Sequence, residues 1–152
     1  MEKIDDEKQL KAWLASNNEH RHIFEKYYNF AREYRLHTSQ FGCFYPFRKM
    51  RKADAKDRWF FNSTNSVFMI ESNPLFERPK CWDKIVEECK KALVALKLDI
   101  GGFDVRVNKD GSDFAIIEAN SACSFGDLTA RRYIHEITKV LQDKHLQFKQ
   151  QH

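Results

Sequence analysis

Three stretches of the chain repeat apolar side chains at steps of three and four residues, the period of an amphipathic helix. Residues 82–97 show it best, with Lys and Glu opposite the apolar positions Ile85, Val86, Cys89, Ala92, Leu93 and Leu96. Residues 127–148 place on one side Tyr133, Ile134, Ile137, Val140 and Leu141. A shorter helix over residues 6–16 follows Asp5 and Asp6, whose carboxylates can cap its first turn.

Between these helices, the side chains alternate in character or are rich in rings and branched residues, which predicts β-strands. The predicted strands cover residues 22–28, 33–38, 41–49, 66–71, 103–108 and 114–120. Pro46 cannot donate to a ladder, so its strand is expected to lie at an edge or to end there. The fold class predicted is α+β, an antiparallel sheet with flanking helices, and the length predicts one domain over residues 1–152.

Composition narrows the classes of protein to consider. No apolar run approaches the roughly twenty residues of a membrane span, and the opening MEKIDDEKQ is too polar for a signal peptide, so we expect a cytoplasmic protein. The four cysteines form no CxxC pair and have no His at zinc-ligand spacing, which argues against a zinc site or a disulfide framework.

The hairpin predicted around Gly111 brings polar side chains together. A loop over residues 109–113 would pair Asn108 with Phe114, and the same register sets Asp104 opposite Glu118. Asn120 then follows two residues along the face that carries Glu118. The alternate residues of the first strand, expected to face the core, are Phe103, Val105 and Val107.

Two opposed carboxylates repel each other unless a cation neutralises them or they share a proton. Carboxylate and amide oxygens suit Mg²⁺, which takes one or two carboxylates together with waters and phosphate oxygens. The alternative is a solvent-facing polar side of the hairpin on which Arg106 relieves the repulsion. Strand pairing alone leaves both interpretations open.

The segments LDIGGFDVRVN and FAIIEANSACSFG resemble the ATP-grasp superfamily, in which a helix, an Asp-bearing strand and a hairpin precede a strand ending in Glu-x-Asn. The resemblance implies that Asp104, Glu118 and Asn120 hold the magnesium ions that bridge the β- and γ-phosphates of ATP. These are the three residues that strand pairing selects. The likeness is to small phage-encoded ATP-grasp proteins in particular, which implies a viral origin and the host cytoplasm.

Upstream, IFEKYYNFAREYRLH is similar to the hinge and following strand of ATP-grasp ligases that join a carboxylate to an amine. The resemblance implies that Glu25 meets the ribose of the nucleotide. It also implies that Lys49 binds phosphate, and that the residues orienting phosphate or substrate carboxylate are Arg35, Arg48 and Arg58. The expected chemistry is ATP-dependent ligation through an acylphosphate, with ATP and Mg²⁺ as cofactors.

The resemblance covers only the second half of the family's pattern. The chain has five glycines and none clustered before residue 101, so the Lys-bearing strand and Gly-rich phosphate loop of the preceding lobe are missing. Three explanations stay open. The chain is a fragment or split-gene half whose other lobe comes from a second polypeptide, a homodimer completes the site, or the protein is a non-catalytic derivative that binds a protein partner or nucleic acid.

The nucleic-acid alternative comes from a basic, aromatic stretch over residues 41–61. Six cations fall in the eleven residues 48–58 beside two acids, Asp54 and Asp57. Alternating rings and cations are typical of surfaces that stack and clamp single strands. The net charge of +4 is modest for a dedicated nucleic-acid-binding protein, so the ligase hypothesis ranks first.

Overall fold

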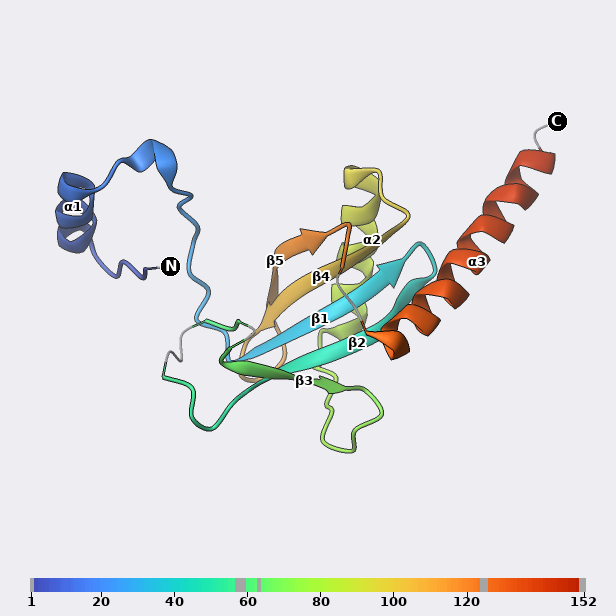
Figure 1. Cartoon of the computed structure of the whole chain (residues 1–152), viewed down its shortest axis with the longest axis horizontal. Helices are drawn as coiled ribbons and strands as arrows, with labels where there is room; N and C mark the ends of the chain where they lie inside the picture. The colour runs from blue at the N-terminus through green and yellow to red at the C-terminus, as the bar shows by residue number, and fades with distance from the viewer. Residues whose placement is uncertain (1, 57–59, 63, 124–125, 151–152) are drawn as a thin grey trace.

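The computed structural model describes residues 2–56, 60–62, 64–123 and 126–150. Its centre is a five-stranded antiparallel sheet in the order β3-β2-β1-β4-β5 (Figure 1). The strands are β1 (Arg32–Ser39), β2 (Gly42–Arg51), β3 (Ser66–Ile70), β4 (Ile100–Val107) and β5 (Phe114–Asn120). The helices are α1 (Glu7–Ser16), α2 (Trp82–Leu96) and α3 (Asp127–Gln150). The predicted α+β class is therefore confirmed. Within the described residues, no helix is long and apolar enough to span a membrane.

Helix α2 covers one face of the sheet and makes the core with it (Figure 1). Its periodic apolar residues are buried or partly buried as the sequence predicts, with Ile85 and Cys89 fully enclosed and Leu93 2% exposed, except that Leu96 in the last turn is 52% exposed. The strands contribute alternate side chains to the same core, including Tyr34, Leu36, Phe103, Val105 and Val107. We call this the core face, and its alternation leaves the intervening residues on the other side of the sheet.

That other side, the charged face, carries Glu33, Arg35, Lys49, Asp104 and Arg106. The cross-strand pairs set these residues together, because β1 lies between β2 and β4. Glu33 is opposite both Lys49 and Arg106, while Arg35 is opposite Asp104. The first half of α3 covers one end of this face, where Ser39 donates a hydrogen bond to Glu136 and Tyr133 meets His37.

The segment before β1 departs from the prediction. The strand predicted over residues 22–28 is wrong. A short 3-10 turn, η1 (Glu19–Arg21), precedes these residues, which form no strand. Rings and branched side chains gave this segment a strand-like composition, but no neighbouring strand pairs with it, and Ile23 is 88% exposed. The helix before it is confirmed, and Asp6 caps it by accepting from the Gln9 amide at 2.8 Å.

The expectation for Pro46 is wrong as stated, because β2 continues past it and lies between β3 and β1 in the sheet. Pairing between β2 and β3 runs only from Phe47 to Arg51 on the β2 side, so Pro46 lies beyond the reach of β3. Its remaining neighbour is Leu36 of β1. The missing amide hydrogen therefore costs no ladder bond to β3.

The buried face of α3 agrees only in part with the predicted one, since Val140 is buried as predicted. Thr129, Glu136 and Val140 are its buried residues. Three residues of the predicted apolar side are exposed, namely Ile134, Ile137 and Leu141. Helical periodicity is confirmed, but the helix presents a more polar side to the sheet because its partners there, Ser39 and His37, are themselves polar.

Candidate functional site

The hairpin of β4 and β5 brings Asp104 and Glu118 opposite each other, as predicted. The register near the turn differs from the predicted one, because Phe114 pairs with Val107 and not with Asn108. The register then shifts between Asp104 and Val105, because the partner of Val105 is Ile116. Such a bulge adds one residue to β5 and re-aims the side chains next to it. In the turn, Gly111 takes the expected positive φ of 77°.

Asp104 is engaged by two cations from the neighbouring strands. Arg35 donates to both carboxylate oxygens, from Nε to Oδ1 at 2.6 Å and from Nη2 to Oδ2 at 2.7 Å. Lys49 Nζ donates to Oδ2 at 2.8 Å. Burial by itself raises the pKa of Asp104, but the hydrogen bonds and charges of Arg35 and Lys49 outweigh it and hold that pKa below its usual value. Asp104 is 3% exposed and is a stable anion at neutral pH.

The ion pairs continue across the sheet from Lys49. Its Nζ also donates to Glu33 at 2.6 Å, and Glu33 accepts from Arg106 Nε at 3.0 Å. Arg106 further donates to the backbone carbonyl of Tyr28 at 3.2 Å, which ties the chain entering β1 to the sheet. Arg106 thus pairs with Glu33, and the suggestion that it relieves repulsion between Asp104 and Glu118 is wrong. That task falls to Arg35 and Lys49.

Glu118 and Asn120 present their side-chain oxygens differently. Glu118 is exposed, and no described residue forms a hydrogen bond or ion pair with its carboxylate. The hydrogen bonds and charge of Asp104 raise the pKa of the Arg35 guanidinium, and the negative charge of Glu118 adds a smaller increase. Asn120 is opposite Gly102, and its backbone carbonyl accepts from the Cys123 thiol at 3.6 Å. The two side chains lie on the charged face with Asp104.

The donor set suits Mg²⁺. Two carboxylates and one amide oxygen are hard ligands, and Mg²⁺ completes its shell with waters and phosphate oxygens. The described residues contain no group of three or more His, Cys, Asp or Glu that could hold a metal, so an all-protein cage is not present among them. Glu118 and Asn120 can receive a cation directly, while Asp104 already accepts hydrogen bonds from Arg35 and Lys49.

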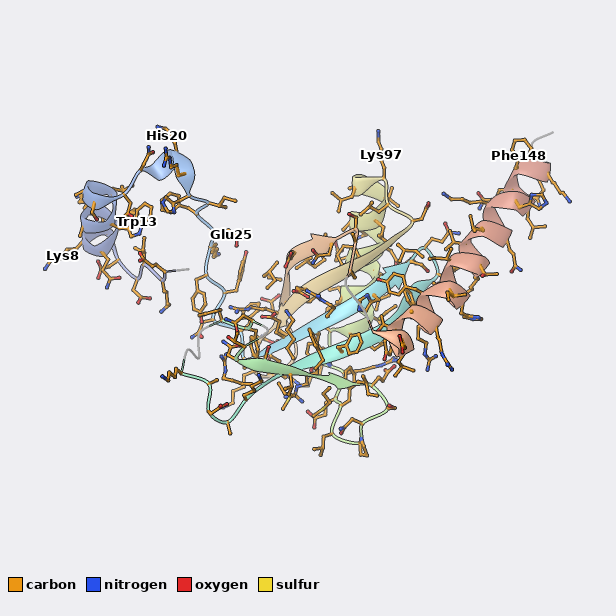
Figure 2. All side chains as sticks on the ribbon, in the orientation of Figure 1. Lys8, Trp13, His20, Glu25, Lys97 and Phe148 are labelled. Atoms are coloured by element: carbon orange, nitrogen blue, oxygen red, sulfur yellow. The ribbon has the colours of Figure 1, made fainter. Side chains whose placement is uncertain are left out.

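Three other predicted site residues do not join this group. Glu25 is exposed on the segment that links α1 to the sheet (Figure 2), and its role at a ribose stays a prediction. Arg48 is opposite Tyr34, so its side chain lies on the core face, away from Arg35 and Asp104. Arg58 lies outside the described residues.

A cluster beside Asp104 was not identified from the sequence as part of the site. His37 Nδ1 lies 2.6 Å from the Tyr133 hydroxyl, and burial lowers the pKa of His37 to about 4, aided by the charge of Arg35. The Cys123 thiol covers Gly102 so closely that a Cβ there would lie 2.3 Å from Sγ. The glycine pair at 101–102 inside a strand is the signal for such an approach, since glycine in a strand often marks close contact.

Comparison with known proteins gives limited similarity. No family model matches the chain, and no curated protein matches it. Among solved structures, the ATP-grasp ligase PsnB complexed with minimal precursor gives a TM-score of 0.47 at 13% identity over 74% of this chain and 35% of that one. PsnB complexed with minimal precursor, Mg and ADP gives 0.44 at 16% identity over 66% and 28%.

The complex of PsnB with precursor peptide PsnA2 and AMPPNP gives a TM-score of 0.43 at 15% identity, covering 66% of this chain and 26% of that one. This chain therefore spans about a third of that ligase or less. These TM-scores and identities are too low to carry an argument about fold or function. Any function proposed for this chain therefore rests on its own residues.

Proposed function

We propose that this chain binds ATP together with Mg²⁺ on its charged face, as the metal-carrying part of an ATP-dependent carboxylate–amine ligase. One observation carries the proposal. Asp104 and Glu118 are directly opposed with Asn120 two residues on, and Arg35 and Lys49 stand on the same face. These are the residue types, in the arrangement, that the sequence resemblance to ATP-grasp enzymes leads us to expect.

On this face, the side-chain oxygens would bind the metal and the cations would bind anionic groups. Glu118, Asn120 and Asp104 would hold Mg²⁺, which would neutralise negative charge on the phosphates of ATP. Arg35 and Lys49 would bind phosphate or substrate carboxylate, Arg35 through the paired N–H groups that it now turns to Asp104. Such a site acts mainly by positioning and charge stabilisation.

The ion pairs of Asp104 occupy the groups that would bind the metal and the phosphate. Arg35 and Lys49 neutralise Asp104. An incoming phosphate offers these cations a new anion and frees Asp104 for the metal. We therefore expect ATP and Mg²⁺ to bind together, and Mg²⁺ alone to bind weakly.

Ligation requires more of the protein than nucleotide binding does. The chain contains no Gly-rich run that could close over phosphates before residue 101. We propose that a second chain or a second copy supplies that part for catalysis. Nucleotide binding by the present chain is the part of the proposal that can be tested directly.

Isothermal titration calorimetry with ATP tests it, in the presence of Mg²⁺ and again with a chelator. We expect binding that needs Mg²⁺ and that weakens roughly ten-fold or more in Glu118→Gln, the scale seen when a group supporting a bound metal is lost. The matched control is Glu87→Gln, an exposed carboxylate on α2 at the other face. Absence of binding at millimolar ATP would contradict the proposal.

A further inference from the structure

A second surface lies at the end of the sheet where the chain enters β1 and leaves β2. It is a hollow of about 410 Å³, and its lining includes Tyr27, Phe30, Arg32, Arg48, Arg51 and Phe61. Lys49 also contributes to the wall. None of the described lining residues is acidic, so the hollow favours an anion.

The charges at this hollow are only partly used by the protein. Lys49 is neutralised by Glu33 and Asp104. Arg32 donates to the Lys109 carbonyl at 3.1 Å and has Glu77 at 4.0 Å. Arg48 forms no hydrogen bond or ion pair through its guanidinium with any described residue, although it is half-buried. A half-buried guanidinium without a counter-charge is a ready site for an anion.

Aromatic rings share the hollow with these cations. The Arg51 guanidinium lies over the Phe61 ring, 4.3 Å from its centroid, and donates to the neutral carbonyl of Phe60 at 2.9 Å. Tyr27 and Phe30 add two more rings to the lining. A ligand that satisfies rings and cations together must carry both a planar group and a negative charge, as a nucleotide unit does.

The positive charge continues along the chain beyond the hollow. Lys52 Nζ donates to the Thr64 carbonyl at 2.9 Å, a neutral acceptor. Lys56 follows at an exposed position, and Asp54 is the described acid of this stretch. Because these cations extend over a longer distance than one phosphate group can cover, they suit a polyanion with repeating charges. Rings can stack only on bases that are unpaired, which favours a single strand over a duplex.

We propose that this hollow and the cations that follow it bind a single-stranded nucleic acid, with a phosphate at Arg48 and a base stacked at Phe61. The surface adjoins the nucleotide site proposed above, because Lys49 belongs to both, but the phosphate contact proposed here is made by Arg48, whose side chain lies on the core face. Binding requires neither Mg²⁺ nor ATP. It depends on salt, since each phosphate contact releases counterions.

Fluorescence anisotropy with a labelled oligothymidylate of roughly ten nucleotides tests the proposal, since sites of this kind cover about 4–16 nucleotides. Titrations at several salt concentrations give both the affinity and its salt dependence. Arg48→Gln should weaken binding several-fold and reduce the slope of log K against log salt by about 0.7, the value for one phosphate contact on a single strand. Phe61→Leu should weaken binding roughly five-fold or more through lost stacking.

The control variant is Lys97→Gln, which removes one positive charge at the far end of α2 (Figure 2). Thermal melting of each variant shows whether it is folded before its affinity is compared. An absence of binding at low salt overturns the proposal. So does an equal loss of affinity in Arg48→Gln and Lys97→Gln, which indicates general charge attraction. Equal competition by inorganic polyphosphate overturns the stacking part, because polyphosphate carries charge without bases.

Discussion

Replacing Asp104 by Asn removes the negative charge that holds Arg35 and Lys49 together. The carboxylate is 3% exposed and accepts three hydrogen bonds from these cations, at 2.6, 2.7 and 2.8 Å. Breaking one partner of a buried ion pair costs about 3–5 kcal/mol, because the other partner remains charged. Lys49 keeps Glu33 and Arg35 is partly exposed, so we expect the lower end of that range, about 3 kcal/mol.

For a chain of this size each kcal/mol lowers Tm by about 2–4 °C, so Asp104→Asn should melt roughly 6–12 °C below the wild type. Glu118→Gln is the matched control. It removes the opposed carboxylate, but Glu118 is exposed, and exposed substitutions usually stay within about 0.5 kcal/mol. Differential scanning calorimetry measures both. Equal melting temperatures for the two variants, or a rise in Asp104→Asn, would refute the idea that Asp104 anchors the charged face.

Three further predictions concern His37, Gly102 and Lys97. Burial lowers the pKa of His37 to about 4 from 6.5. Between these pH values the unfolded chain binds a proton that the folded chain does not. The contribution of His37 to the free energy of unfolding is therefore fully present above pH 6.5 and falls by roughly 3 kcal/mol as the pH drops to 4. Urea unfolding across this pH window should show the fall in wild type and in the exposed control His135→Gln, and a smaller one in His37→Gln. Gly102→Ala places a Cβ 2.3 Å from Cys123 Sγ and should cost about 1–3 kcal/mol by overpacking, with thermal melting showing partial recovery when Cys123→Ala is added. Lys97 ends α2 at a φ of 56°, so Lys97→Gly should raise the urea midpoint by relieving about 1 kcal/mol of left-handed strain, and a lower midpoint would disprove that strain.

The elements that the sequence predicts well are those whose pattern is local. Helix α2 has an uninterrupted apolar stripe, and its residues Ile85, Cys89 and Leu93 are buried as that stripe requires. The strand predicted over residues 22–28 was wrong because ring-rich composition measures a preference for sheet without supplying a partner strand. For α3, periodicity fixes the helix, but the side that packs depends on what the sheet presents.

The candidate site shows the same division. Asp104 and Glu118 belong to one hairpin, so a local register argument could pair them, although it missed the bulge that makes the pairing work. The neutralisation of Asp104 by Arg35 and Lys49 depends on β1 lying between β2 and β4. Strands far apart in the chain make that contact, and a sequence pattern does not encode their register. The destabilisation expected on removing Asp104 therefore follows from the structure and not from the sequence pattern.

The central claim is that ATP and a divalent cation bind at Asp104, Glu118 and Asn120. Paramagnetic Mn²⁺ in place of Mg²⁺ tests it most directly, by NMR of the ¹⁵N-labelled chain with ATP. Our account predicts that Mn²⁺ with ATP broadens first the amide signals of these three residues, and spares those of α2 on the core face. Broadening centred on Arg48 and Arg51, or none at millimolar Mn²⁺ and ATP, would contradict it.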